Sequence, residues 1–483
     1  MASGYYSTSD IQLLCSLINY FYSDFVQLIT LSDSHEGRKV YALRIGKGNS
    51  TSRPGVLFIG GVHARELVNP DLLIKFAIKL CAAYSQSNDL VFGAKSYSAS
   101  SVELIVETLD LFILPLVNPD GRSYVLDPAG DAWWRKNRNP NPGLSCQGVD
   151  INRNFDFLWS SGIGTSASSC SEIYKGGGAF SEPETTNIKK LLDDYPQIER
   201  MIDVHSYSQL ILYPWGDDDL QTTSPSMNFT NSTYDGLRGT TGDMVYREYM
   251  SQADLDRYVA TANRIRDGIA SHRGRTYTVQ PSINLYPTTG TSNDYSYSRH
   301  IANSAKQKVI AYCVETGTQF QPVYSEAEEI MTEVSIGLTE FLFDTICPVE
   351  ATTTLSRRNY KVGLEAARQF RDRGMAATQA GQRYLSLFRQ HRAEVVQLLF
   401  TDKALARELA ALLPSLFSLV RATGEGGNKK VSAKVIDGAE KLLTRLDRNA
   451  SKPLSSDLRA LRKDLPRFKD VTLQQGFERL SRG

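Results

Sequence analysis

Three side chains that could carry out catalysis each follow a short apolar run of the sequence. They are His63 after residues 56–59, His205 after residues 201–204 and Glu315 after residues 309–314. Short apolar runs of this length are typical of buried strands, and ligands of open α/β sheets bind beyond the carboxyl ends of their strands. We therefore expect these side chains to meet in one crevice, although they lie far apart in the sequence.

The segment His63-Ala64-Arg65-Glu66 places an imidazole and a carboxylate three residues apart, where both could bind one metal ion. Catalytic zinc commonly takes two histidines and one acidic residue and leaves a fourth position for water, and His205 would complete that set. Taken alone, the segment is weak evidence, because charged surface turns produce it by chance. A lone His205 would more often be a hydrogen-bonded core histidine. The prediction of a zinc site therefore depends on the other motifs of the sequence.

The elements that must position these residues alternate between strand-like runs and amphipathic patterns as far as about residue 345. Residues 111–117 predict a further buried strand, and residues 72–83 and 255–269 predict helices. This alternation indicates an α/β sheet with helices on its faces. Residues 11–31 are apolar but interrupted by polar side chains, so we expect an amphipathic helix there rather than a membrane span.

The composition changes near residues 348–356, which we interpret as a linker between a catalytic domain of residues 1–347 and a second domain of residues 357–483. From residue 356 onward the chain holds 26 Lys and Arg against 13 Asp and Glu, whereas the whole chain is nearly neutral. Leucines recur there at helical spacing, which predicts an all-α domain with a basic outer face. Those cations either only keep the helix surfaces exposed to solvent or bind an anionic surface. That surface would be an external partner, such as cell wall or nucleic acid, or the acidic catalytic domain.

The length and composition exclude several classes of protein. With 483 residues, 41% of them hydrophobic, the chain can bury a large core and is neither disordered nor fibrous. No run of about 18 apolar residues predicts a transmembrane segment. The six cysteines contain no CxxC pair and so predict no structural zinc site. The first basic residue is Arg38, so we expect no signal peptide in this chain.

Seven short motifs occur along the first domain, and their order in the sequence is informative. They are His63-Ala64-Arg65-Glu66, Asn118-Pro119-Asp120-Gly121, Trp134-Arg135-Lys136-Asn137-Arg138, Asp150-Ile151-Asn152-Arg153-Asn154-Phe155, His205-Ser206-Tyr207-Ser208-Gln209, Tyr286 before residues 290–294, and Val314-Glu315-Thr316. Each is weakly specific, but together they closely resemble the zinc metallocarboxypeptidases of the carboxypeptidase A/B type over about residues 5–345. The resemblance implies a mixed twisted sheet flanked by helices and an exopeptidase that hydrolyses C-terminal peptide bonds. The helical tail lies outside the resemblance.

Carried over position by position, the resemblance implies a catalytic centre with one zinc ion. Its residues would be the ligands His63, Glu66 and His205, the carboxylate Asp150 beside the first histidine, the general base Glu315 and the oxyanion-stabilising Arg135. A carboxylate beside water activated by zinc can take its proton and later deliver it to the leaving amine. A fixed arginine adds positive charge where negative charge develops. A carboxylate on a ligand histidine fixes its tautomer and orientation.

The same resemblance implies a site for the free carboxylate at the C-terminus of a peptide or protein. Its residues would be Asn152, Arg153 and Tyr286, with Arg65 and Tyr207 on the crevice wall and Asn293 at the base of the specificity pocket. Isolated arginines are more often solvated or paired in salt bridges, but this motif context favours carboxylate binding. Because Asn293 is neutral and Leu212, Gly216 and Cys313 are expected on the pocket wall, we expect a preference for neutral C-terminal residues.

Cys146 and Cys170 occupy the family's disulfide positions, which implies an oxidising, extracytoplasmic location. Two buried thiols in a cytoplasmic enzyme are the alternative. Residues 217–252 form a polar stretch that we expect to be a long loop at the cleft mouth. Two further functions stay open: a non-catalytic carboxypeptidase-like domain that binds peptides or sugars, and an amidase-like enzyme that acts on cell-wall peptides.

Overall fold

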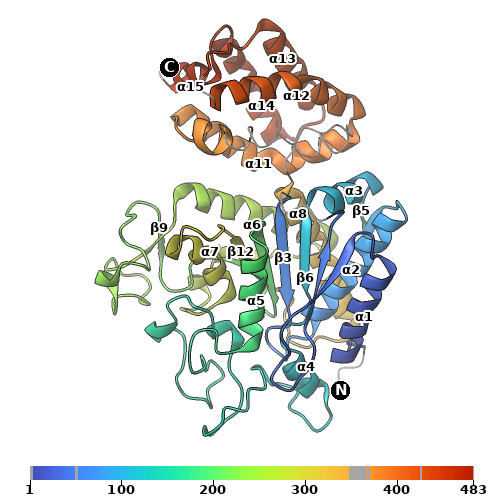
Figure 1. Cartoon of the computed structure of the whole chain (residues 1–483), viewed down its shortest axis with the longest axis vertical. Helices are drawn as coiled ribbons and strands as arrows, with labels where there is room; N and C mark the ends of the chain where they lie inside the picture. The colour runs from blue at the N-terminus through green and yellow to red at the C-terminus, as the bar shows by residue number, and fades with distance from the viewer. Residues whose placement is uncertain (1–3, 49–52, 347–366, 368–369, 425–426, 482–483) are drawn as a thin grey trace. The chain divides into compact units, whose positions relative to one another are not determined.

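A computed structural model of the chain describes residues 4–48, 53–346, 367, 370–424 and 427–481. The chain divides into two compact units, Met1–Leu342 and Phe343–Gly483, which are shown in Figure 1 and are described one at a time below. The expected linker at residues 348–356 lies outside the described residues.

An eight-stranded mixed sheet forms the centre of the first unit. Its strands, in spatial order, are β1 (Val26–Thr30), β2 (Tyr41–Ile45), β6 (Asp110–Leu114), β3 (Gly55–Gly60), β7 (Ile198–His205), β12 (Ile310–Glu315), β8 (Leu210–Tyr213) and β11 (Thr278–Pro281). The central strands β6, β3, β7 and β12 run parallel to one another, so their carboxyl ends share one edge. The antiparallel pairs are β1–β2, β2–β6 and β8–β12. The expected mixed sheet is therefore confirmed.

Helices cover both faces of this sheet, and Figure 1 shows α5 in front of the strands and α8 behind them. The helices of the first unit are α1 (Thr8–Phe21), α2 (Val68–Ser85), α3 (Ala99–Thr108), α4 (Pro119–Leu126), α5 (Pro183–Asp194), α6 (Gln252–Arg273), α7 (Ser292–Ala302) and α8 (Tyr324–Thr345). Strand β3 reads Gly-Val-Leu-Phe-Ile-Gly and is buried at every position, as expected for a strand covered on both faces.

The alternation of side chains decides which residues of β7 face the site. Phe58 of β3 contacts Phe76 of α2 and Phe341 of α8, which places α2 and α8 on one face of the sheet. Arg200 of β7 lies over Phe341 and so points to that same face. Met201, the next residue, contacts Ser296 of α7 instead. Because successive side chains of a strand point to opposite faces, the residues two and four positions after Met201 share the face covered by α7.

The structure corrects the expectation of one amphipathic helix over residues 11–31. Helix α1 ends at Phe21, and strand β1 begins at Val26 and pairs with β2. Val26 at the start of β1 and Leu31 directly after its end are both buried, although neither belongs to a helix. The apolar residues continue across the turn between α1 and β1, so composition alone gave no sign of the change from helix to strand.

The polar stretch of residues 217–252 is folded around buried side chains. It contains two short strands, β9 (Leu220–Gln221) and β10 (Glu248–Tyr249), which pair in parallel. Tyr246 and Glu248 are fully buried, and the Tyr246 hydroxyl donates a hydrogen bond to Glu248 at 2.6 Å. Buried polar groups that bond one another hold this long connection in one conformation.

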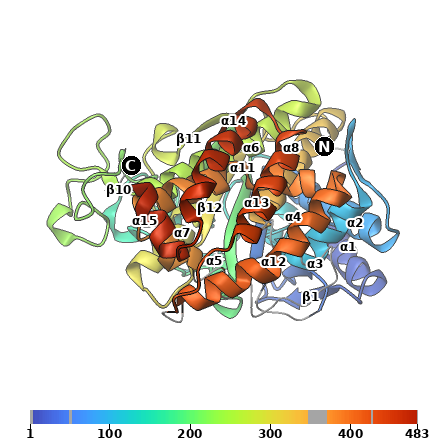
Figure 2. The same cartoon turned by 90° about the horizontal axis from the view of Figure 1, so that it is seen from above.

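The second unit consists of helices, as the sequence predicts. They are α11 (Gln379–Thr401), α12 (Lys403–Gly424), α13 (Ala433–Asp447), α14 (Lys452–Asp464) and α15 (Leu473–Ser481). Helix α13 packs against both α12 and α14 (Figure 2). Their leucine faces form a core that includes Leu405, Leu413, Leu446 and Leu458. No helix within the described residues is long and apolar enough to cross a membrane.

Candidate active site

The three expected catalytic side chains meet at the carboxyl edge of the sheet. His205 is the last residue of β7 and Glu315 the last residue of β12, and the two are directly paired in the parallel register. His63 lies in the turn after β3, where Gly61 has φ of +67°. A side chain at that glycine would come within 2.9 Å of Pro70 and Leu116, so the turn that carries His63 requires glycine.

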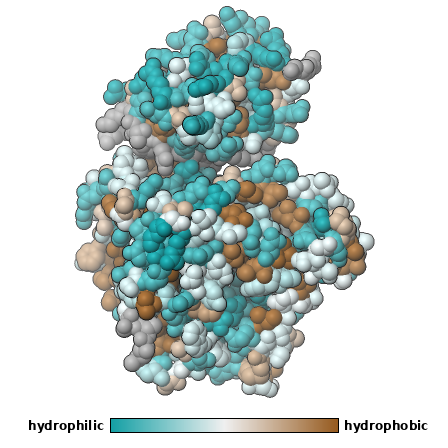
Figure 3. Space-filling view, turned by 180° about the vertical axis from the view of Figure 1, so that it is seen from behind, coloured by the Kyte–Doolittle hydropathy of each residue, from teal (hydrophilic) through white to brown (hydrophobic). Residues whose placement is uncertain are grey.

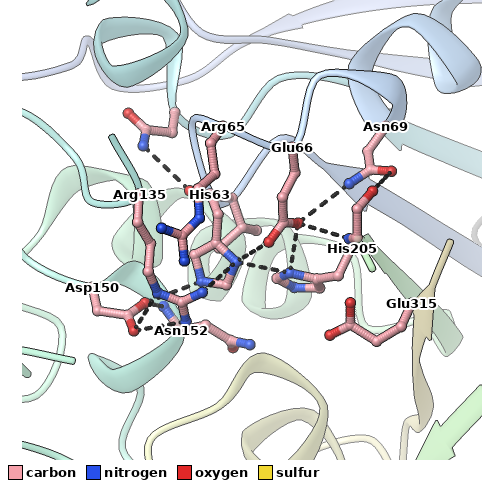
Figure 4. Close-up of polar contacts among 12 residues, drawn as sticks. His63, Arg65, Glu66, Asn69, Arg135, Asp150, Asn152, His205 and Glu315 are labelled. Atoms are coloured by element: carbon pink, nitrogen blue, oxygen red, sulfur yellow. Dashed lines mark hydrogen bonds and ion pairs between the residues drawn. The ribbon is translucent and has the colours of Figure 1, made fainter. Parts of the chain in front are cut away.

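The side chains of His63, Glu66 and His205 converge in a buried cluster (Figure 4). His63 Nδ1 lies 2.7 Å from Glu66 Oε1 and 3.1 Å from His205 Nδ1. His205 Nδ1 lies 3.2 Å from Glu66 Oε2. Two ring nitrogens and one carboxylate therefore face a common point.

This donor set fits a zinc ion. Tetrahedral zinc, with bonds of about 2.0–2.1 Å, holds its ligand atoms about 3.3 Å apart, close to the two longer separations of the cluster. Burial alone would raise the pKa of Glu66, but the two histidines hold it well below its ordinary value. Positive charge is thus favoured at the point where the three groups meet, and a cation bound there would supply it.

Each of the three groups has a polar neighbour on the side away from the cluster or at its carboxylate. His63 Nε2 lies 3.1 Å from Asp150 Oδ1, and His205 Nε2 lies 3.0 Å from Asp203 Oδ2. Glu66 Oε2 accepts a hydrogen bond from the backbone N–H of Ser206 at 3.0 Å. The ring nitrogens that face away from the metal position thus both lie beside a buried carboxylate, the usual arrangement around ligand histidines.

Arg135 links the metal cluster to Asp150. Its Nε and Nη2 atoms donate to Asp150 Oδ2 at 3.1 and 2.9 Å, and its Nη1 lies 3.3 Å from His63 Nδ1. Burial opposes the charge on Asp150, but Arg135 and His63 hold the pKa of this carboxyl well below its usual range. The arginine is therefore fixed beside the metal position with its charge retained.

Glu315 is partly exposed, and its carboxyl makes few contacts. Its Oε2 has no hydrogen-bond partner within the described part of the chain, and the Cys313 thiol lies 3.9 Å from its Oε1. Figure 4 shows this carboxyl beside His205 with no polar contact to the other labelled side chains. Burial is the main cause that raises the pKa of Glu315 to about 8. A divalent cation in the adjacent cluster would lower that pKa.

The residues expected to bind the substrate carboxylate lie together in a second group. Arg153 donates from Nη1 to the Asn152 carbonyl at 2.6 Å and from Nε to the Gly164 carbonyl at 2.8 Å. Its guanidinium lies 5.9 Å from the ring centre of Tyr286, which is half exposed. Asn152 Oδ1 accepts the backbone N–H of Ser292 at 2.9 Å. Backbone contacts thus hold Arg153 in place behind an accessible tyrosine.

Arg65 and Tyr207 meet around an aromatic residue that the sequence reasoning missed. The Arg65 guanidinium lies 4.4 Å from the ring centre of Phe320, and the Tyr207 ring lies 4.8 Å from the same residue. Arg65 also donates to the Trp133 carbonyl at 3.3 Å. Phe320 comes five residues after Glu315, outside any of the seven motifs, so motif spacing could not have identified it.

Asn293 lies in α7 and is almost completely buried. Its Nδ2 donates to Ser282 Oγ at 3.1 Å. The next residue, Asp294, is also buried, and burial raises its pKa to about 7. Its Oδ2 accepts the Thr291 hydroxyl at 2.8 Å. Below pH 7 this carboxyl is therefore mostly neutral.

Asp203, which contacts His205, is a second residue that the sequence did not reveal. It lies two positions before His205 on β7 and therefore on the same face. The spacing was present in the sequence as Asp-Val-His. Residues 198–205 are nearly all buried, however, so the strand shows no alternation of polar and apolar residues that would assign Asp203 to a face.

A second group with metal-ligand chemistry, His35 with Glu182 and Glu184, is explained by hydrogen bonds. Glu182 accepts from His35 at 2.8 Å, from Asn137 at 2.7 Å and from Asn139 at 2.9 Å. Because these donors already occupy its oxygens, the group is a buried hydrogen-bonded cluster that holds the loop next to Arg135.

Cys146 and Cys170 form the expected disulfide. Cys15, Cys81 and Cys313 are buried free thiols, and Cys347 lies outside the described residues.

Comparison with known proteins agrees with this site. The family model described as Zinc carboxypeptidase matches residues 12–335. Metallocarboxypeptidase A of Arthroderma otae is 36% identical over 195 residues, which are 39% of this chain and 42% of that protein. Carboxypeptidase B of Helicoverpa zea is 34% identical over 223 residues, which are 44% of this chain and 48% of that protein. The chain thus spans about half the length of these curated relatives.

A solved structure of bovine thrombin-activatable fibrinolysis inhibitor in complex with tick carboxypeptidase inhibitor contains a chain with the same fold. Its TM-score is 0.54 at 25% identity, over 71% of this chain and 97% of that chain. The protein belongs to the zinc carboxypeptidase family. His63, Glu66 and His205 are the zinc-binding triad typical of that family.

Proposed function

We propose that this protein is a zinc-dependent exopeptidase that removes the C-terminal residue of peptides and proteins. The observation that carries the proposal is the pairing of Glu315 with His205 at the ends of adjacent strands. It places a carboxyl, one of whose oxygens has no hydrogen-bond partner among the described residues, next to a metal cluster, while Arg135 lies on the other side of that cluster. Family membership and the complete ligand set support the same activity.

In this proposal each side chain has a separate task in the hydrolysis. Zinc held by His63, Glu66 and His205 would supply Lewis acidity at the scissile carbonyl. Glu315 takes the proton of the attacking water and delivers it to the departing amine, which requires a carboxyl free of other partners. Arg135, held by Asp150, stabilises the negative charge that develops on the carbonyl oxygen.

Recognition of the substrate C-terminus falls to the wall that holds Arg153. A guanidinium binds a carboxylate through two parallel N–H groups, and Arg153 is fixed by its contacts to the Asn152 and Gly164 carbonyls. Tyr286 lies over this guanidinium and is exposed enough to contact a bound peptide. Asn152 extends the same wall, and we assign Arg65 and Tyr207, around Phe320, to residues upstream of the scissile bond.

A preference for neutral C-terminal residues is part of the proposal. Asn293 carries no charge, and its amide is bonded to Ser282. The neighbouring Asp294 is mostly neutral below pH 7 and is bonded to Thr291. Below pH 7 these two residues therefore add little fixed charge, which favours apolar, aromatic and amide side chains at the C-terminus of the substrate.

A matched set of peptides tests the proposed function. Peptides that differ only in a C-terminal Phe, Arg or Glu, each with a free or an amidated C-terminus, would be incubated with the zinc-loaded protein. We expect release of the C-terminal residue from the free peptides only, with kcat/KM higher for Phe than for Arg. A chelator should abolish cleavage, and added zinc should restore it. Equal cleavage of amidated peptides, or release of cell-wall fragments alone, would contradict the proposal.

We further propose that residues 1–347 form the catalytic domain and residues 357–483 a separate basic helical domain that binds an anionic partner. One surface of that domain supports this role. It consists of the exposed cations Lys429, Lys430, Arg467, Lys469 and Arg479, here called the basic surface. On the side shown in Figure 3, hydrophilic residues predominate on this domain.

The backbone brings the members of the basic surface together. Val431 N–H donates to the Val471 carbonyl at 2.8 Å, which aligns the two segments that carry the lysines. Arg467 and Arg479 each donate to the backbone carbonyl of the other at 3.5 Å. Other cations of the domain form ion pairs, for example Arg445 with Asp402. The basic surface forms none among the described residues, so its charge is open to a partner.

The Cys146–Cys170 disulfide supports an extracytoplasmic location, because disulfides persist in oxidising compartments. We include that location in the proposal.

A further inference from the structure

We propose that Asp203 is a positioning residue for the zinc ligand His205 and gives this site a second carboxylate–histidine pair. The inference rests on zinc binding by the triad, as in the proposed function. Asp203 belongs to none of the seven motifs, and it stands beside His205 as Asp150 stands beside His63.

The Asp203 carboxylate lies directly beside the His205 ring. Its Oδ2 lies 3.0 Å from His205 Nε2, and both residues are completely buried. Among the described residues this contact is a close ion pair rather than an aligned hydrogen bond, and its carboxylate is the acceptor that would hold a proton on Nε2. A proton held on Nε2 leaves the Nδ1 lone pair free, and Nδ1 is the atom that faces Glu66 and His63.

Asp203 is itself held by α7. The Ser292 hydroxyl donates to Asp203 Oδ2, and Ser292 is the first residue of that helix. The positive end of the helix dipole therefore lies beside the carboxylate and stabilises its charge. The backbone N–H of Ser292 donates to Asn152 Oδ1, so one residue joins Asp203 to the wall proposed to bind substrate.

The cost of burying Asp203 also indicates a function. Its Oδ1 is buried and has no hydrogen-bond partner among the described residues. A buried carboxylate oxygen without a partner destabilises a fold, so a merely structural residue at this position would be better replaced by an apolar one. A cation at the nearby triad would offset that cost.

The test compares zinc affinity rather than activity alone. Asp203→Asn keeps the shape of the side chain but removes its charge, and Asp203→Ala removes the acceptor. We expect both variants to bind zinc about 10- to 100-fold more weakly than the wild type in competition with a chromogenic chelator. The Co²⁺-loaded variants should show a shifted visible absorption spectrum. Ser292→Ala is the matched control: it removes a neighbour of Asp203 but no carboxylate, and we expect less than a threefold loss.

The outcomes separate this inference from the proposed function. If the wild type binds no zinc, the proposed function fails. If the wild type binds zinc and both folded Asp203 variants bind it within twofold as tightly, with an unchanged Co²⁺ spectrum, only the Asp203 inference fails. If the variants do not fold, NMR spectra of the zinc-loaded wild type test the inference instead. The signal of the His205 Nε2–H proton should be shifted downfield, and the proton should be protected from exchange with solvent. Fast exchange of that proton would overturn the inference.

Discussion

Glu315 and His205 are direct partners in the register of the parallel strands β12 and β7, and each is the last residue of its strand. A sheet fixes the relative position of such a pair through the backbone hydrogen bonds of both strands. The distance from the proposed general base to His205 is therefore set by the backbone of the sheet, not by a loop. This arrangement suits proton transfer, which depends on positions accurate to a fraction of an ångström.

The first prediction concerns Glu315→Gln. The amide keeps the size of the side chain but cannot take up a proton, so we expect kcat to fall by several powers of ten. Zinc content and KM should change little, because Glu315 is not one of the triad ligands. Steady-state kinetics with metal analysis would check this, and a near-normal kcat would assign the base to another residue.

Replacing each of the two arginines of the site with alanine should change a different kinetic constant. Arg153→Ala should mainly raise KM, because this residue is proposed to bind the substrate carboxylate in both the ground state and the transition state. Arg135→Ala should mainly lower kcat, because charge on the carbonyl oxygen develops only in the transition state. The ratio of cleavage of free to amidated peptides should fall in Arg153→Ala alone. The opposite pattern would exchange the two roles.

Much of this site could be predicted from the sequence because strand ends and motifs are local features. His63, His205 and Glu315 each follow an apolar run, Glu66 lies three residues after His63, and the disulfide follows from the resemblance. Asp203 could not be found in that way, because β7 is buried on both faces and its pattern does not distinguish them. Phe320 was missed because its contact with Arg65 joins residues 255 positions apart. The helix predicted over residues 11–31 continues past the end of α1 at Phe21, because apolar residues continue into β1.

The buried carboxyls of the long connection 217–252 predict that stability depends on pH. Burial raises the pKa of Glu248 to about 7, above its value of about 4.3 in an unfolded chain. The pKa of Asp217 is also raised, by burial and by Glu248. The folded state therefore binds more protons than the unfolded state between these values. The free energy of unfolding is greatest below about pH 4.3 for these groups and falls as the pH rises through 7.

Asp217→Asn tests this dependence, because the amide can donate to Glu248 without losing a proton. We expect the melting temperature of the wild type to fall more steeply between pH 5 and pH 8 than that of the variant. Asp194→Asn is the matched control, because Asp194 is half exposed and paired with Lys190 on the surface. Calorimetry of the three proteins in one buffer series would measure the slopes. Identical slopes for Asp217→Asn and the wild type would show that the pair does not titrate.

The last prediction concerns the basic surface of the second domain. Exposed cations without carboxylate partners attract polyanions through forces that salt screens, and the Debye length shrinks from about 10 Å at 0.1 M salt to about 3 Å at 1 M. We expect the full-length protein to bind a heparin-type polyanion at low salt, with a Kd that rises steeply as salt is added. Replacing Lys429, Lys430 and Lys469 with Ala should weaken that binding at least tenfold and leave peptidase activity unchanged. The control replaces Lys39, Lys189 and Lys190 of the first unit, which removes the same charge from cations already paired with carboxylates. Binding that does not respond to salt, or equal losses in the two triple variants, would show that the cations of the basic surface only interact with solvent.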